Sequence, residues 1–401
     1  MKALITPNQI IIKLPTKSPA NCNHTITFPS PTPPYILSDP IKLMASEDSI
    51  EIPPEIITNI LHRLPSKPLT RFKTVSKNWQ SLISDPQFIK HHQKTLNRRH
   101  LICDIYNTPL YSFPINPHHQ TPQNLTRHLP HTDKFTFHGS CNGLVLASAD
   151  DFDGAHSLIV INPTTRECIQ VPESGYDVVD KLLQVDIKYG FGYDPLTDDY
   201  KVVTVSYFHN NYIMFPRTMS VHVYSLRDND WRRVGDSVYN HTRGWNLPGV
   251  FVNCVLHWVV GKGLDGLRVI VGFSLADETF SEVPSPEFGD RGDVLSKREC
   301  RLVVVGEKLG VFFEDKVWVM NEYGVRESWV KIVINGINKI RVVDPEILYE
   351  DGKILMLCRG LMWVYDVEEK CFRERIDICG GVGGVMVRDS YVESLVSPKF
   401  R

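Results

Sequence analysis

Glycine-rich stretches are the first place in this sequence to look for chemistry. Gly261-Lys-Gly-Leu-Asp-Gly266 fits the G-x-G-x-x-G pattern, which binds a dinucleotide when a helix N-terminus follows it and meets the pyrophosphate. The next residues, Leu267-Arg-Val-Ile-Val, are instead typical of a strand. We therefore interpret these glycines as a loop between two strands and expect no cofactor there.

A cysteine at a tight turn is the second candidate. Gly139-Ser-Cys-Asn-Gly143 places Cys141 where a nucleophile elbow has its reactive residue. Such an elbow joins a strand to a helix, whereas Leu144-Val-Leu-Ala continues as a strand. Because Asn-Gly is the dipeptide that favours two-residue hairpins, we expect a hairpin turn at Asn142-Gly143 and no catalytic residue.

Histidines and carboxylates are the remaining candidates for metal binding or catalysis. Four histidines lie in a loop with no cysteine or acid at metal-ligand spacing, namely His118, His119, His128 and His131. Six acids lie at expected turns, where Asx hydrogen bonds account for them, namely Asp194, Asp198, Asp199, Asp228, Asp230 and Glu368. We predict no catalytic residue, metal or cofactor, and we expect Arg166 to have a structural role.

Short helices precede the strands. Apolar residues recur at the spacing of one helical face from Ile52 to Leu64, and Pro53-Pro54-Glu55 supplies a helix start, so a helix is expected over residues 54–63. Further helix caps are expected at Ser66, Ser76 and Asp85. A unit of three helices this small, with no metal or disulfide, is expected to complete its core against another surface.

The order of these residues resembles the F-box of plant F-box proteins. The resemblance rests on Ile52-Pro-Pro-Glu-Ile-Ile57, Leu64-Pro65, Leu69, Arg71-Phe72, Val75-Ser-Lys-Asn-Trp79 and Leu82-Ile-Ser-Asp-Pro-Gln-Phe88, with Ile52 where the family usually has leucine. It implies a three-helix F-box over residues 49–95 that docks to the Skp linker of a cullin-RING ubiquitin ligase. A plain helical cap on the following domain is the alternative.

We expect eight residues of this segment to form the docking face for the linker, or the core that shapes it. They are Pro53, Ile56, Leu61, Leu64, Pro65, Leu69, Val75 and Trp79. Apolar anchors are expected to dominate in an interface of this size.

A four-strand pattern repeats through the rest of the chain. Its marker residues are Cys168, Trp231, Phe280, Trp329 and Phe372, which lie 63, 49, 49 and 43 positions apart. Four short strands in roughly 40 to 50 residues is typical of a β-propeller blade. We expect five blades within 139–375 and a sixth if residues 101–115 pair with 385–396, because closure removes the open sheet edges. A two-sheet β-sandwich is the alternative.

Three motifs of this region also resemble the F-box-associated, kelch-like domain found behind plant F-boxes. They are Gly139-Ser-Cys-Asn-Gly-Leu144, Asn162-Pro-Thr-Thr-Arg166 and the stretch from Gly190-Phe-Gly-Tyr-Asp-Pro to Val203. The expected organisation is a disordered, proline-rich leader over 1–48, the F-box over 49–95, a linker with the first strands over 96–138, and a kelch-like propeller over 139–398. A translation start at Met44 is an alternative interpretation of the leader.

The composition of the chain indicates its cellular compartment and excludes some classes of partner. The chain has 401 residues and nine scattered cysteines with no C-x-x-C pair, which indicates reduced thiols in the cytoplasm or nucleus. No apolar run approaches the length that spans a membrane. Residues 52–99 carry nine Lys and Arg against two acids, but these charges are spread over several helices and turns, so we predict no nucleic-acid binding.

These expectations together describe a non-enzymatic adaptor. The F-box would dock to the Skp linker, and through it to cullin and RING subunits, while the propeller presents an unknown target protein for ubiquitination. Loops at 116–134, 171–186, 207–218 and 236–248 are candidates for target contacts by length and composition. The rival hypothesis is a β-propeller enzyme or sugar-binding protein in which the helices are incidental.

Overall fold

The protein is described from a computed structural model. The described residues are 2–6, 9–13, 25–29, 53–96, 98–105, 109–115, 123–127, 134–150, 156–174, 184–209, 219–241, 247–262, 267–287, 300–337, 346–350, 352–358, 360–378 and 385–399. The chain forms two compact units, Met1–Leu64 and Pro65–Arg401, and each is described by itself.

The first unit contains three strands and one helix. The strands β1 (Lys2–Thr6), β2 (Gln9–Lys13) and β3 (Thr25–Pro29) form an antiparallel sheet. Apart from these strands, residues 1–48 lie outside the described part of the chain, so the disordered leader stays a prediction. Helix α1 (Pro54–His62) has proline at its first position and Glu55 in its first turn, as expected from the sequence.

The second unit begins with three helices. They are α2 (Ser66–Phe72), α3 (Lys77–Ser84) and α4 (Pro86–Leu96), so the region has four helices rather than three. Ser76 caps α3 by accepting a hydrogen bond from the Trp79 amide, as predicted. The predicted cap at Ser66 is wrong: Pro65 occupies the N-cap position of α2, and Ser66 is the first helical residue.

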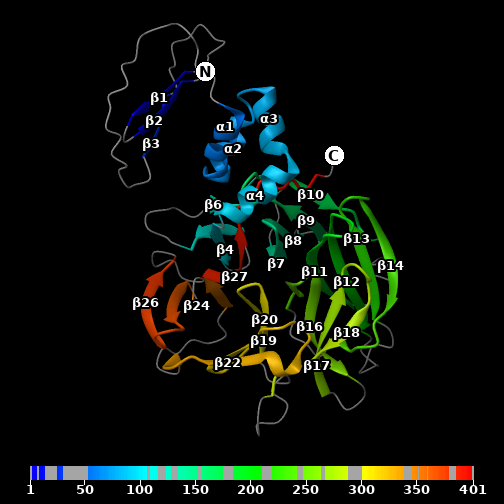
Figure 1. Ribbon diagram of the computed structural model, residues 1–401. Coiled ribbons are helices and arrows are strands. Elements are labelled where there is room, and N and C mark those ends of the chain that lie inside the picture. Colours follow the sequence, from blue (N-terminus) through cyan, green and yellow to red (C-terminus); the bar gives the residue numbers. More distant parts are fainter. Residues whose placement is uncertain are drawn as a thin grey trace. The chain divides into compact units, whose positions relative to one another are not determined.

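Six four-stranded antiparallel sheets follow, and they are the blades of a propeller (Figure 1). Blade 1 holds β7 (Lys134–Cys141), β8 (Leu144–Asp150), β9 (His156–Ile161) and β10 (Cys168–Val171). Blade 2 holds β11 (Gln184–Asp194), β12 (Asp199–His209), β13 (Ser220–Ser225) and β14 (Asp230–Asp236). Blade 3 holds β15 (Val250–Val252), β16 (Val255–Lys262), β17 (Leu267–Ser274) and β18 (Phe280–Val283).

Blade 4 holds β19 (Arg301–Val305), β20 (Lys308–Phe313), β21 (Lys316–Met320) and β22 (Trp329–Val333), with the 3-10 helix η3 (Arg326–Ser328) before β22. Blade 5 holds β23 (Glu346–Glu350), β24 (Lys353–Cys358), β25 (Leu361–Asp366) and β26 (Cys371–Asp377). The sixth blade combines β27 (Val385–Val392) with β4 (Arg99–Ile105), β5 (Tyr111–Pro114) and the two-residue β6 (Gln123–Asn124).

The sixth blade closes the ring with strands from both ends of the domain. Strand β27 is the innermost strand and pairs with β4, from Val385 opposite Ile105 to Val392 opposite Arg99. This confirms the predicted pairing of residues 101–115 with 385–396 and overturns the alternative β-sandwich. Strand β6 was not expected, because it lies in a stretch interpreted as a loop.

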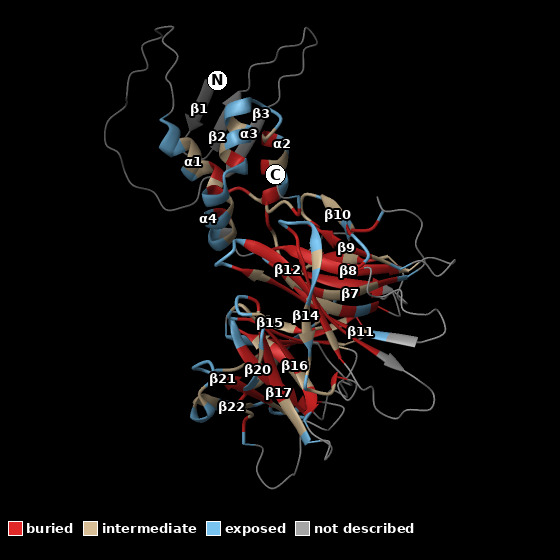
Figure 2. Cartoon of the chain, turned by 90° about the vertical axis from the view of Figure 1, so that its right-hand side faces the viewer, coloured by how far each residue is buried: buried red, intermediate tan, exposed pale blue. Residues whose placement is uncertain are grey.

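Apolar residues fill the spaces between neighbouring blades. The central strands are almost entirely buried, as in β8 and β13, whereas the outer strand β14 consists of exposed and half-buried residues (Figure 2). Continuous apolar runs in the central strands follow from this burial on both faces. One cluster joins Val203 of blade 2 to Trp258 of blade 3, and another joins Leu101 of the closing blade to Leu355 of blade 5.

Strand direction gives the ring two different faces. In blades 1 to 5 the inner strand leads into a short connection, such as Asn142-Gly143 or Gly306-Glu307, and these turns define the tight-turn face. The chain enters β4 at this same face, because Arg99 pairs with the last residue of β27. The connections that lead from one blade to the next emerge at the opposite end, which we call the long-loop face.

A matched pair of glycine substitutions tests how tightly the segment after β27 packs against the turn at Gly143. Gly143 and Gly352 both have positive φ, at 82° and 75°. A Cβ at Gly143 would lie 2.2 Å from the Ser394 Cβ, whereas nothing lies within 4 Å at Gly352. We expect Gly352→Ala to cost about 1 kcal/mol of backbone strain and Gly143→Ala at least about 1 kcal/mol more, because the C-terminal segment must shift. Chemical denaturation measures both, and equal losses would contradict close packing of that segment.

Candidate functional site

Helix α1 carries part of the predicted docking set. Leu61 is 1% exposed and Leu64 is 9% exposed, whereas Ile56 is 49% exposed and Pro53 is also exposed. The apolar stripe of this helix is therefore only partly used inside the protein. Ile56 is an exposed apolar side chain on an amphipathic helix, so it is available for contact with the surface of a partner.

The segment from α2 to α4 carries the rest of the docking set. Leu69 is fully buried, while Val75, between α2 and α3, is 38% exposed. Trp79 is half-buried and meets the Phe72 ring edge-on, with ring centroids 5.3 Å apart. The Asp85 carboxylate accepts hydrogen bonds from the Gln87 and Phe88 amides and so starts α4, as the sequence predicted.

Burial thus divides the eight predicted residues into two roles. Leu61, Leu64 and Leu69 belong to the interior, Pro65 and Trp79 are intermediate, and Pro53, Ile56 and Val75 are exposed. Periodicity alone did not separate these groups. Docking of the linker by these residues stays a prediction, and the exposed members are the ones that a partner would reach.

Two of the sequence motifs hold the C-terminal segment. The Asn162 side chain is fully buried, and its Nδ2 donates to the Ser394 carbonyl at 3.0 Å and to the Val396 carbonyl at 2.6 Å. Its Oδ1 accepts from the amides of Thr164 and Thr165, which makes an Asx turn. Asn162-Pro-Thr-Thr-Arg and the Asn142-Gly143 turn therefore act as a clamp on residues after β27.

Glu393 connects this clamp to the helical region of the same unit. Its carboxylate lies 3.0 Å from His100 Nε2, and its amide donates to the Arg98 carbonyl at 2.8 Å. Burial raises the pKa of Glu393, but His100, Arg98 and the amide of Ser66 at the start of α2 outweigh it, so the pKa lies below its usual range. Sequence reasoning missed this residue, because its partners are far away along the chain.

A cavity of about 560 Å³ lies among the inner strands of the propeller. Its charged lining, within the described part of the chain, consists of five basic and two acidic residues, namely Arg99, Lys188, Arg268, Arg301 and Arg388, with Glu307 and Asp389. Burial lowers the pKa of Lys188 to about 8, so this side chain keeps most of its charge at neutral pH. Burial also lowers the pKa of His241 to about 3 and that of His257 to about 4, which leaves both imidazoles neutral.

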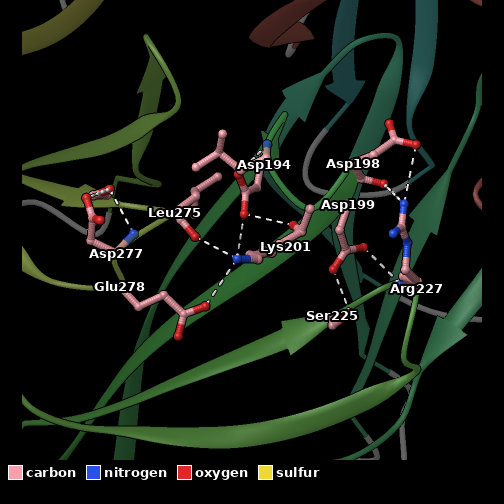
Figure 3. A network of polar contacts seen from close by, with 12 residues as sticks. Asp194, Asp198, Asp199, Lys201, Ser225, Arg227, Leu275, Asp277 and Glu278 are labelled. Carbon is pink, nitrogen blue, oxygen red and sulfur yellow. Dashed lines mark hydrogen bonds and ion pairs between the residues drawn. The ribbon is translucent and has the colours of Figure 1, made fainter.

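The acids of the turn between β11 and β12 have structural partners (Figure 3). Asp194 accepts from the Leu196 amide at 3.0 Å, which confirms the predicted Asx turn, and from Lys201 Nζ at 2.9 Å. Lys201 Nζ also reaches the Leu275 carbonyl and Glu278 of blade 3, at 2.6 and 3.2 Å. Asp199 binds the Ser225 hydroxyl and the Arg227 amide. These carboxylates join strands and blades and are not arranged around a cavity.

The other candidate chemical motifs are turns between strands. Asn142 and Gly143 both have positive φ, which confirms the hairpin turn, and burial raises the pKa of the Cys141 thiol well above its usual range. Strands β16 and β17 flank Gly261–Gly266, so no helix follows this glycine motif. His118, His119, His128 and His131 lie outside the described residues. Among the residues that are described, no three His, Cys, Asp or Glu side chains gather as a metal site, and no helix could cross a membrane.

Comparison with known proteins agrees with this architecture. The F-box domain matches residues 50–91, and the F-box associated beta propeller domain matches residues 99–349. The chain is 31% identical over 349 residues to the F-box protein CPR1 of Arabidopsis thaliana, covering 80% of this chain and 83% of that protein. It is 27% identical to an F-box/kelch-repeat protein of the same plant, covering 86% and 96%. Among solved structures, TolB from Acinetobacter baumannii is similar with a TM-score of 0.46 at 10% identity, covering 73% and 66%.

The buried cation of Figure 3 yields a test of stability. Lys201→Met leaves the fully buried Asp194 carboxylate without its cation. We expect a loss of about 3–5 kcal/mol in the free energy of unfolding, as for one partner removed from a buried pair. Chemical denaturation measures it. The exposed pair of Lys262 with Glu282 is the matched control, and Lys262→Met should leave the denaturation midpoint nearly unchanged.

The lowered pKa of Glu393 predicts that the stability contributed by its carboxylate is lost in acid. A carboxylate whose folded pKa is lowered stabilises the fold above its unfolded pKa and loses that contribution as the pH falls through the folded value. Wild-type stability should therefore fall on acidification below the usual glutamate pKa, and Glu393→Gln should be less stable at pH 7 with a smaller acid-dependent loss. Thermal unfolding from pH 7 to pH 3 measures this, and parallel pH profiles for the two proteins would contradict it.

Proposed function

The chain belongs to the plant F-box proteins that carry an F-box associated β-propeller domain, and on this premise we propose that it is the substrate-recognition subunit of an SCF-type ubiquitin ligase. The F-box docks to a Skp-type linker, and through it to cullin and RING subunits. The propeller holds a target protein for ubiquitination. The observation that carries the proposal is an F-box with exposed apolar side chains joined to a closed propeller.

The docking step rests on apolar side chains that the protein itself leaves exposed. Ile56 on α1 and Val75 after α2 are the exposed branched residues of the predicted set. Full burial of an exposed side chain of this kind contributes roughly 1.5–3 kcal/mol, and burial of the part of Ile56 or Val75 that is still exposed contributes about half of that or less. The F-box therefore provides anchors for a linker surface without any charge pair being required.

Ubiquitin transfer needs no active site in this chain. Holding a target lysine near the charged conjugating enzyme raises its effective concentration, and the chemistry belongs to that enzyme. F-box proteins are generally non-catalytic adaptors, and the acids of Figure 3 make structural contacts within blade 2 and between blades 2 and 3. We place the adaptor in the cytoplasm or nucleus, consistent with free cysteines at the seven described positions.

Target contacts belong to the long-loop face in this proposal. Three of the four candidate loops, 171–186, 207–218 and 236–248, join strand ends at that face, while the chain reaches the ring from α4 at the tight-turn face. The central parts of these loops, and most of 116–134, lie outside the described residues. Loops on a rigid ring are common carriers of recognition, because the scaffold fixes their ends.

Linker docking is tested with charge substitutions at the exposed anchors. We expect Ile56→Asp and Val75→Asp each to weaken binding of a purified Skp-type linker by at least about tenfold, since a buried hot spot is worth about 2 kcal/mol or more. Calorimetric titration measures the affinity, and circular dichroism checks the fold. Asn59→Asp adds the same charge on the exposed surface of α1 and should bind as wild type.

Retained linker affinity in both charge variants would overturn the docking assignment. Turnover of a substrate by the purified chain without partners would instead favour the rival hypothesis of a β-propeller enzyme. The docking variants also help to identify the target. A full-length variant that does not bind the linker should still bind its target without causing its ubiquitination, so the target should accumulate on the variant in affinity capture.

A further inference from the structure

The charge of the propeller cavity differs in sign from that of the domain around it. Residues 100–401 carry 31 basic and 40 acidic side chains, so the domain as a whole is negative. Among the described residues that line the cavity, five are basic and two are acidic. A concave site with one sign of charge and low-dielectric walls concentrates counter-ions, so this cavity favours an anion even on an acidic protein.

The basic side chains reach the cavity from different blades. Lys188 is on the inner strand of blade 2, Arg268 on β17 of blade 3 and Arg301 on the inner strand of blade 4. Arg388, on the inner strand of the closing blade, forms an ion pair with the buried Asp104. An anionic group that enters along the axis of the ring would therefore meet cationic groups on several sides.

The same charges are graded along the axis. Arg301 is the first residue of β19 and Arg268 the second of β17, and both strands begin at the long-loop face. The acidic Glu307 stands in the turn after β19, at the tight-turn face. Arg99, the first residue of β4, is a basic group at that same face. Among the described lining residues, the tight-turn end thus combines a basic with an acidic residue, whereas the end nearest the candidate recognition loops holds two arginines.

Size and chemistry indicate a group larger than a single ion. A volume of about 560 Å³ lies within the 300–1,000 Å³ usual for ligand pockets, which is room for several side chains. Apolar and aromatic residues, among them Phe137, Phe191 and Trp258, share the lining with the basic groups. Such a mixture suits a peptide with carboxylates spaced by apolar side chains better than a fully hydrated small anion.

We propose that the propeller channel is the specificity site for the target, and that it takes an acidic, partly apolar segment of the target protein inserted from the long-loop face. This inference rests on the proposed adaptor function and adds the chemical class of the segment recognised. Arg268 and Arg301 select for carboxylates in that segment, and the apolar lining binds its remaining side chains.

Selection of peptides by the intact protein tests the proposal without knowledge of the target. The probe is a random library of peptides of about 12 residues, each of which spans about 40 Å when extended. Peptides retained by the full-length wild type should be enriched in Asp and Glu over the input library. A synthesised winner should lose at least about tenfold in affinity for the double variant Arg268→Gln/Arg301→Gln, and the affinity should fall as salt is added.

Two matched variants separate a cavity effect from loss of charge elsewhere or of the fold. Arg326→Gln/Lys331→Gln removes two exposed charges from the outer side of blade 4, and its affinity should stay within about twofold of wild type. Arg268→Lys/Arg301→Lys keeps the charge and should retain most of the binding. Thermal unfolding of each variant checks that the ring is intact.

Three outcomes would overturn the proposal. They are a retained pool with no excess of acidic residues, equal losses of affinity in the cavity and outer-side variants, and binding of citrate with the same dependence on Arg268 and Arg301 while no peptide binds. The last result would assign the cavity to a small free anion. Binding of the Skp-type linker to the same cavity variants is measured separately and does not depend on the peptide result. Failure of the peptide proposal therefore leaves the docking proposal intact, and failure of docking leaves the peptide result interpretable.

Discussion

The pairing of β27 with β4 is the contact on which the rest of the structure depends. It joins residues almost three hundred positions apart, so the chain must be complete before the last blade can form. Without it, the inner edge of β4 would expose unpaired backbone groups, and blade 5 would expose the apolar residues that pack against the closing blade. The clamp by Asn162 on residues 394 and 396 extends the same closure beyond the last strand. The chain passes from α4 into the ring at β4, which is the strand that pairs with β27. The helical region is therefore connected to the propeller where both ends of that domain meet.

Much of this architecture could be predicted from the sequence, because each blade is local. Alternating strand pairs, turn residues and the spacing of Cys168, Trp231, Phe280, Trp329 and Phe372 predicted five blades, and the strands left over at the two ends predicted the sixth. The errors arose where two signals compete at neighbouring positions. Ser66 is a good cap by residue type, but Pro65 already has the extended conformation that an N-cap requires. Strand β6 is two residues long and carries no periodic signal.

The candidate sites were predictable to different degrees for a physical reason. The F-box residues lie within one stretch, so their order is visible in the sequence, but helical periodicity does not tell whether an apolar side chain such as Ile56 or Leu61 faces the interior or a partner. The basic cavity has no local signature at all. Lys188, Arg301 and Arg388 lie on three separate strands, β11, β19 and β27, and only the closed ring brings them around one axis.

The proposed adaptor function needs rigidity of the chain more than chemical reactivity. If ubiquitin transfer depends on effective concentration, any looseness between the bound target and the docked linker lowers that concentration directly. The buried ion pair of Lys201 in blade 2 with Glu278 in blade 3 contributes little net stability but favours one arrangement of the two blades, because a shift of either blade would separate the two charges. The contact of Glu393 with His100 fixes the geometry of the segment after β27 relative to β4 in the same way. In the proposed adaptor, the acids that resemble catalytic candidates in the sequence therefore act by fixing geometry.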